Sequence, residues 1–114
     1  MSTLDASVAA GESGPLITLS GEADLTNAAE LSELITGQLS GETLHLTIDT
    51  SGLTFADTAA VRILVLAART LRQRGGDLVL LRPQRTLVRV MEITGTDQMF
   101  TIHGVTELRS KPEP

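Results

Sequence analysis

The stretch LTIDTSGLTFADTAAVRILVLAARTLRQRGGDLVLL, residues 46–81, decides the fold of this 114-residue chain. Apolar and polar residues alternate at its beginning, as they do in a half-buried strand. Apolar residues then recur at helical spacing as far as Gly75 and Gly76, and a short apolar run follows these glycines. Because a strand, a helix and another strand follow in this order, we expect parallel strands covered by helices.

The helix within this stretch has a predicted start and a predicted end. Asp57 is expected to be its N-cap, with a carboxylate that accepts hydrogen bonds from the free N–H groups of Ala59 and Ala60. Gly75 and Gly76 are expected to stop the helix. The spacing predicts one buried side, formed by Val61, Leu64, Val65, Ala68 and Leu71.

The flanking sequence predicts the remaining elements. Strands are expected at residues 4–10, 16–19, 44–48, 77–81 and 99–102, and the polar run at residues 49–52 is expected to end the third of them. Further helices are expected to open at Thr26 or Asn27 and at Pro83, the second of them closed by Gly95, with a final helical turn at residues 105–108. The order β-β-α-β-α-β-α-β predicts an α/β fold, with a mixed, mostly parallel sheet, an N-terminal β-hairpin and helices packed against the sheet.

Length and composition indicate one domain with an aliphatic core. The mean hydropathy of +0.14 favours a packed core over disorder, and the chain has only two Phe and no Tyr or Trp. We expect the domain to cover residues 1–108 and a flexible tail to follow at residues 109–114. No run approaches the roughly 20 apolar residues that span a bilayer, and the first residues do not resemble a signal peptide, so the cytoplasm is the expected compartment.

Charge is distributed unevenly along the chain. Residues 1–57 contain nine acidic residues and no Lys or Arg, whereas residues 62–89 contain seven Arg against one acid, Asp77. Either the two halves neutralise each other in the folded protein, or one face is basic and attracts an acidic partner. The net charge of −5 and the shortage of aromatic residues argue against nucleic-acid binding.

Catalytic, metal and cofactor sites are not expected. The absence of Cys excludes disulfides and thiolate chemistry. His45 and His103 lack the spacing of a metal-binding pair, and His45 is expected on a solvated strand face. A phospho-accepting receiver domain would need a Lys at its site, but the single Lys of this chain is Lys111, in the expected tail. We therefore expect a protein that is not an enzyme and needs no cofactor or metal.

The helix beyond Asp57 is apolar on more than one side. If Val61 lies at the centre of the buried face, then Ala59, Ile63 and Leu66 fall on the far side, beside the cationic Arg62. Such a helix is either buried on both sides or exposes a contact surface. We expect a surface for a partner protein.

Several linked motifs resemble the STAS family, that is, the anti-anti-sigma factors or anti-sigma factor antagonists. The family pattern runs Asp-x-Ser-x-Leu-x-Phe-x-Asp-Ser-Ser-Gly-Leu, and five residues of this chain fall on it in register: Asp49, Ser51, Leu53, Phe55 and Asp57. Residues 21–24 (GEAD) are similar to the family's Gly-Glu-Leu-Asp, and residues 87–95 resemble its helix ending in Ser-Gly. The resemblance covers residues 4–105, almost the whole chain.

The resemblance implies a switch in partner binding. Members of this family bind an anti-sigma factor, often a serine kinase that carries its own ATP, and so release a sigma factor to transcription. The kinase phosphorylates the second hydroxyl of Asp-Ser-Ser-Gly, which adds about 1.5–2 negative charges to the docking surface and breaks the complex.

This chain departs from the family at the phosphorylated position. Asp57-Thr58-Ala59-Ala60 stands where Asp-Ser-Ser-Gly is expected, so Ala59 occupies the acceptor position and cannot be phosphorylated. Thr58 keeps the first hydroxyl, which can form a cap-type hydrogen bond or serve as a substitute acceptor. Together with the helical spacing, the resemblance predicts a docking surface centred on Asp57, Thr58, Ala59, Arg62, Ile63 and Leu66, with Asp24 nearby. The alternative is a scaffold or sensory STAS module that recognises a small ligand or other signalling partners.

Overall fold

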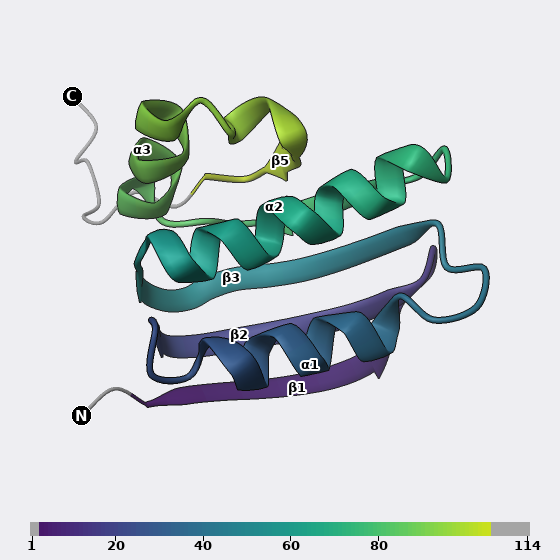
Figure 1. Cartoon of the computed structure of the whole chain (residues 1–114), viewed down its shortest axis with the longest axis horizontal. Helices are drawn as coiled ribbons and strands as arrows, with labels where there is room; N and C mark the ends of the chain where they lie inside the picture. Colours follow the sequence, from purple (N-terminus) through teal and green to yellow (C-terminus); the bar gives the residue numbers. More distant parts are fainter. Residues whose placement is uncertain (1–2, 106–114) are drawn as a thin grey trace, which may run out of the picture.

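The computed structural model describes residues 3–105, which form an open sheet of five strands in the order β1-β2-β3-β4-β5 (Figure 1). The strands are β1 (Leu4–Ala10), β2 (Pro15–Ala23), β3 (His45–Ala56), β4 (Asp77–Leu81) and β5 (Thr101–His103). The helices are α1 (Ala28–Gln38), α2 (Thr58–Gln73) and α3 (Arg85–Thr94), with a short 3₁₀ turn, η1, at Asp97–Met99. The tail expected at residues 109–114 lies outside the described residues, and the helical turn expected at 105–108 extends beyond them.

The sheet is mixed, as the sequence predicts. β1 pairs with β2 in antiparallel fashion, and the pairs β2–β3, β3–β4 and β4–β5 are parallel. The order of strands and helices and the α/β fold class are confirmed.

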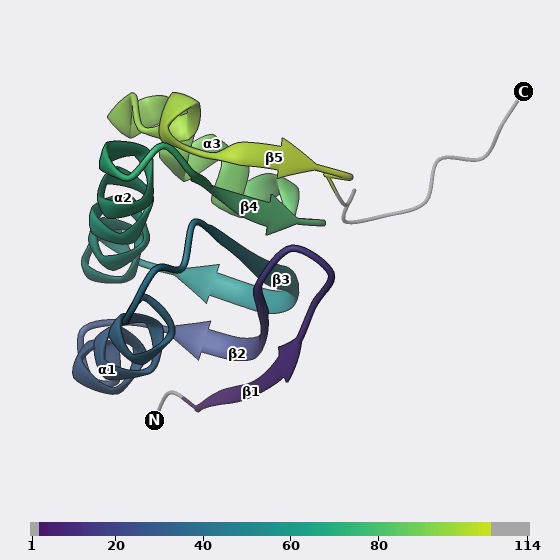
Figure 2. The same cartoon turned by 90° about the vertical axis from the view of Figure 1, so that its right-hand side faces the viewer.

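Two helices cover one face of the sheet. Figure 2 shows α1 and α2 side by side on the same face, while α3 lies near the end of β3 at which α2 begins (Figure 1). The layer between the sheet and these two helices is aliphatic, and its fully buried side chains include Ile17, Leu19, Leu46, Ile48, Leu78 and Leu80 from the sheet and Leu31, Ile35, Leu64 and Leu71 from the helices. The expected aliphatic core is therefore present in the described residues.

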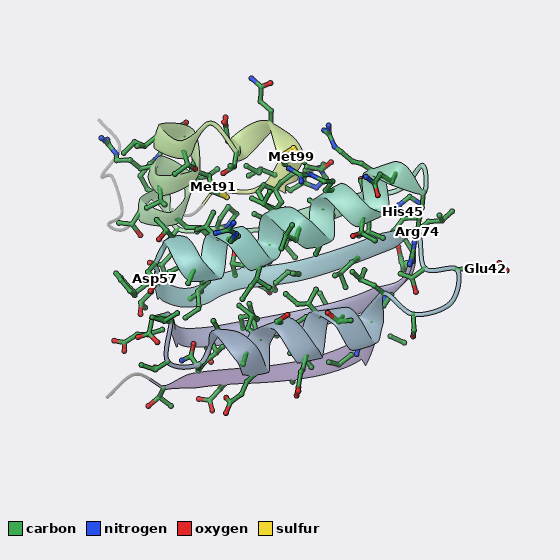
Figure 3. The ribbon with its side chains drawn as sticks, in the orientation of Figure 1. Glu42, His45, Asp57, Arg74, Met91 and Met99 are labelled. Carbon is green, nitrogen blue, oxygen red and sulfur yellow. The ribbon has the colours of Figure 1, made fainter. Side chains whose placement is uncertain are left out.

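One arginine joins the far ends of the two covering helices. Arg74 is the C-cap of α2, and its guanidinium donates hydrogen bonds to the carbonyls of Leu39, at 2.7 Å, and Thr43, at 3.0 Å. Leu39 is in turn the C-cap of α1. The bond satisfies a carbonyl that a helix end leaves without an intrahelical partner, so it fixes α2 against α1 at the end opposite Asp57 (Figure 3).

The prediction that residues 49–52 end the third strand was wrong, because β3 continues without a break to Ala56. Thr50 is fully buried, and its hydroxyl donates to the carbonyl of Leu81 on β4 at 3.3 Å. The backbone of Gly52 passes so close to β2 that an added Cβ would lie 2.9 Å from the Cβ of Ser20. The polar run is therefore strand, and Gly52 permits a close approach between neighbouring strands.

Two other strand boundaries differ from the predictions by more than one residue. β2 extends to Ala23 and not only to Leu19. β5 begins at Thr101 because η1 occupies residues 97–99, and Phe100, which was expected within the strand, is buried in the core ahead of it.

The extended β2 and β3 position the site. Because these strands are parallel and Ala23 pairs with Ala56, both end at the same edge of the sheet. The loop from β2 to α1 and the start of α2 therefore leave the sheet side by side, at the edge where parallel α/β sheets place their binding residues.

Candidate functional site

Asp57 fixes the start of α2. Its Oδ1 accepts the N–H of Ala60 at 3.0 Å, and its own N–H donates to the carbonyl of Ala23 at 3.1 Å. The expected N-cap and the bond from Ala60 are confirmed, but the expected bond from Ala59 is not present. The second oxygen, Oδ2, instead accepts the N–H of Leu25 from the β2–α1 loop at 3.1 Å.

The β2–α1 loop is held by its own side chains. The Asp24 Oδ1 accepts the N–H of Thr26 at 3.0 Å and its hydroxyl at 2.6 Å. The buried Asn27 accepts the N–H of Asp24 at 2.9 Å and donates to the carbonyl of Glu22 at 2.9 Å. Asn27 is the N-cap of α1, but its side chain organises the loop and makes no cap hydrogen bond to the helix. Asp24 lies next to the start of α2, because both of its chain neighbours bond to Asp57.

The outward face of α2 exposes a ridge of polar, cationic and apolar side chains, formed by Thr58, Arg62 and Leu66. Thr58, Arg62 and Leu66 are exposed, with 51% of Leu66 accessible, and Ala59 is half-buried. Among the described residues, the Thr58 hydroxyl has no hydrogen-bond partner. Ile63 lies differently: it is half-buried and lines a small hollow against α1. Leu66 is therefore the exposed apolar side chain of the ridge, whereas Ile63 lies at the boundary with α1.

A groove with a volume of about 750 Å³ follows this ridge from the β2–α1 loop to the end of α3. Its lining residues are Leu25, Asp57, Thr58, Ala59, Val61, Arg62, Val65, Leu66, Arg69, Thr94 and Thr96. Of the residues expected at the docking surface, Asp57, Thr58, Ala59, Arg62 and Leu66 meet in the groove, whereas Asp24 and Ile63 lie beside it.

Six residues of the groove lining are not among those expected at the docking surface: Leu25, Val61, Val65, Arg69, Thr94 and Thr96. Leu25 is 75% exposed although it is a large apolar residue. It follows Asp24 in the family-like motif, and that position is the only sequence signal that could have identified it. Val65 was expected on the buried side of the helix but is half-buried at the groove.

The side chains that line the groove carry a net positive charge, because two arginines stand against one carboxylate. Arg62 and Arg69 are exposed, and neither forms an ion pair with another described residue. Both oxygens of the acidic residue in the lining, Asp57, already accept backbone N–H groups. An ion pair between the acidic and the arginine-rich halves of the sequence does form elsewhere, between Asp49 and Arg82 at 2.6 Å.

Asp49 has a shifted pKa, although it lies away from the groove. Partial burial acts to raise the pKa of the carboxyl, but the hydrogen bonds from Ser51 and the adjacent Arg82 guanidinium outweigh burial and hold the pKa below its ordinary value. The N–H of Ser51 donates to Asp49 at 3.0 Å. These motif residues therefore have a structural role within β3.

Neither a metal-ligand cluster nor a membrane-spanning helix occurs in the described part of the chain. Within residues 3–105, no group of three or more His, Asp or Glu side chains is arranged to hold a metal ion. His45 lies at the far end of the sheet, where its Nδ1 contacts the Asp77 carboxylate at 2.7 Å. None of the helices that the structure describes has the length and apolar character needed to cross a membrane.

This chain is similar to known proteins in sequence and in fold. The family model described as "Mlab, STAS domain" matches residues 6–105. Anti-sigma-F factor antagonist RsfA of Mycobacterium tuberculosis is 28% identical over 106 residues, which cover 91% of this chain and 83% of that protein. The anti-sigma-B factor antagonist of Listeria monocytogenes is 32% identical over 89 residues, which cover 78% of each chain.

The fold also matches a solved structure. An anti-sigma factor antagonist from Mycobacterium paratuberculosis superimposes with a TM-score of 0.79 and 22% identity, covering 89% of this chain and 86% of that one. Anti-sigma factor antagonists are non-enzymatic regulators. From the matched domain, the related sequences and the shared fold, we conclude that this chain belongs to the STAS domain family and, within it, to the anti-sigma factor antagonists.

Proposed function

We propose that this protein docks on an anti-sigma factor through the groove along α2 and thereby releases a sigma factor to transcription in the cytoplasm. The anti-sigma factor would be of the serine kinase type, which carries its own ATP. The observation that carries the proposal is the exposure of Leu25 and Leu66, 75% and 51%, in one groove along α2. Large apolar side chains exposed together in a groove are typical of a surface that a partner covers.

In the proposed docking surface, apolar side chains would contact the partner, and the hydrogen bonds of Asp57 would hold the elements that carry them in place. Leu66 and Ala59 supply apolar contact, Arg62 supplies charge, and Asp57 holds both the helix start and the loop that carries Leu25. Asp24 and Ile63 would lie at the rim, because they flank the groove without lining it. A specific interface buries about 1,200–2,000 Å² in total, so this groove would form only its centre.

The proposal includes the loss of the usual phosphorylation switch. Ala59, at the second position of α2, carries no hydroxyl, and its side chain lines the groove. Without an acceptor at this position, docking would be constitutive or controlled by the supply of the protein and its partner. Thr58 is the one hydroxyl next to it on the helix, and it is exposed.

The test uses the anti-sigma factors encoded in the same genome. Each purified factor is titrated with this protein by calorimetry, and the factor that binds is incubated with ATP and with wild type, Thr58→Ala or Ala59→Ser. We expect one factor to bind, no phosphate on wild type, and one phosphate on Ala59→Ser by mass spectrometry. Phosphate on wild type that disappears in Thr58→Ala would show that the switch has moved, and failure of every factor to bind would refute the docking function.

A scaffold or sensory module is the second candidate. The groove of about 750 Å³ lies in the size range of small-molecule pockets, roughly 300–1,000 Å³. This candidate predicts a small molecule that copurifies with the protein and is detected by native mass spectrometry, together with no affinity for an anti-sigma factor.

A further inference from the structure

We infer that the segment docking in the groove is an acidic amphipathic helix of the partner, with two carboxylates about two helical turns apart on either side of an apolar residue. The inference rests on the proposed docking function and specifies the chemistry of its partner. The carrying observation is the spacing of Arg62, Leu66 and Arg69 along the exposed ridge of α2.

The three side chains form a charged, apolar, charged pattern on one helix face. Leu66 is four residues after Arg62 and three before Arg69, and residues at these spacings share a face. The two arginines are separated by roughly 10 Å along the axis, the rise of seven helical residues. A second helix packed along α2 presents residues at the same intervals, so acidic residues at the outer positions would meet both guanidinium groups.

Neither arginine is engaged within the described part of the chain. Arg62 and Arg69 have no ion pair or hydrogen bond there, in contrast to Arg72, which donates to the carbonyl of Gln98 at 2.8 Å, and Arg74, which donates to Leu39. The cations of the groove are therefore available to a partner. The protein as a whole has a net charge of −5, so this positive charge is local and opposes the sign of the remainder.

The lining of the groove carries one carboxylate, that of Asp57, against the two guanidinium groups. The Asp57 carboxylate accepts two N–H groups, from Ala60 and from Leu25. On the α3 side, the Thr94 hydroxyl donates to the carbonyl of Val90 at 3.0 Å and contacts the Thr96 hydroxyl at 2.9 Å. Charge complementarity therefore favours an anionic partner, and the apolar side chains of Leu25 and Leu66 favour an amphipathic one.

A pair of synthetic helical peptides of about 20 residues tests this inference without an identified partner. The first peptide has two glutamates seven positions apart and a leucine four positions after the first, and the second has glutamine in place of both glutamates. Each is titrated into isotope-labelled protein, and amide chemical shifts locate the binding surface. We expect shifts at Leu25, Arg62 and Leu66, and tighter binding of the glutamate peptide.

Variants of the protein identify the groups that contact the peptide. Arg62→Gln and Arg69→Gln should each weaken binding of the glutamate peptide about two- to fivefold and leave the glutamine peptide unaffected. Arg89→Gln is the matched control, because Arg89 is exposed on α3 outside the groove. Added salt should weaken only the glutamate peptide.

Several results would overturn the inference: no binding, equal affinities for the two peptides, the same loss in Arg89→Gln, or binding to phosphatidylglycerol vesicles in place of the peptide. If an anti-sigma factor binds but the two peptides do not differ, this inference fails while the proposed function stands. If the peptides behave as expected and no anti-sigma factor binds, the proposed function fails instead.

Discussion

Asp57 and Leu25 are 32 positions apart in the sequence, yet the carboxylate of the first accepts the N–H of the second at 3.1 Å. The same carboxylate caps α2 through Ala60. One side chain therefore sets both the direction of α2 and the position of the loop that carries the most exposed leucine of the groove.

Replacement of Asp57 should separate its two roles. Asp57→Ala removes the cap and the loop bond, and it should lower the free energy of unfolding by about 1–2 kcal/mol. Asp57→Asn can keep the cap through its amide oxygen, but its NH₂ group cannot accept the N–H of Leu25. We therefore expect a smaller loss of stability in urea unfolding, with faster amide exchange at Leu25. Equal stability losses and unchanged exchange at Leu25 would contradict this assignment.

Leu64 and Leu66 form a matched pair on α2, because one is 1% exposed in the core and the other is 51% exposed on the ridge. Leu64→Ala should lower the free energy of unfolding by about 2–5 kcal/mol. Leu66→Ala should change it by less than about 0.5 kcal/mol, while affinity for the anti-sigma factor falls on the order of tenfold or more. Urea unfolding and calorimetric titration measure the two effects. Undiminished affinity in Leu66→Ala would remove this residue from the docking surface.

A negative charge at position 59 should affect docking but not folding. An acidic residue in the first turn of a helix is compatible with the helix dipole, so Ala59→Glu should leave the free energy of unfolding within about 0.5 kcal/mol. The same charge would be desolvated beneath the partner and would pair with Arg62, three residues further along α2, so that this cation is lost to the partner and affinity should fall on the order of tenfold or more. Gln73→Glu, in the exposed last turn of α2 and outside the groove, is the control. An equal loss of affinity in both variants would indicate a general charge effect.

Asp49 should make stability depend on acid pH. Because the hydrogen bonds from Ser51 and the adjacent Arg82 guanidinium hold its pKa below that of the unfolded chain, its contribution to stability is complete above about pH 4 and is lost as the pH falls through the folded-state pKa. Asp49→Asn should therefore be less stable than wild type at pH 7, and the difference should shrink below about pH 4. Urea unfolding across this range measures it, and a difference that stays constant with pH would exclude ionisation of Asp49 as the cause.

Replacing each of two glycines by alanine should change the free energy of unfolding in opposite directions. A Cβ on Gly76 would lie 1.7 Å from the carbonyl oxygen of Leu44, so Gly76→Ala must displace backbone and should cost more than about 2 kcal/mol. A Cβ on Gly37, in α1, meets no atom within 4 Å, so Gly37→Ala should raise the free energy of unfolding by about 0.5–1 kcal/mol. Thermal unfolding of both variants checks the signs. A stable Gly76→Ala would show that the β4 approach to Leu44 is not tight.

The elements with strong local signals were predictable from the sequence. Asp57 and the glycines at 75 and 76 bound α2, as expected, and Gly95 closes α3 with a left-handed φ of 73°. The continuation of β3 was not predictable, because the polar character of residues 49–52 suggests a loop unless the partner of Thr50 is known. That partner, the carbonyl of Leu81, comes from a strand 31 residues away.

The sequence predicted the site residues that lie on α2, but not those that other elements contribute. Helical spacing identified Ala59, Arg62 and Leu66, since they share a face whatever the rest of the chain does. Leu25, Thr94 and Thr96 reach the same groove only because parallel strands end at one edge of the sheet and α3 lies beside it. Ile63 was assigned to the far side, but the packing of α1 against α2 leaves it half-buried.

Ala59 lines the groove without belonging to the buried core. Alanine and serine codons differ by a single base, and a serine here would be accommodated at the first turn of the helix. Under the proposed function, a single-base change would therefore add or remove covalent control at this residue without passing through an unstable ancestor. A lineage would then exchange an inducible regulator for a permanently engaged one while its architecture stays the same.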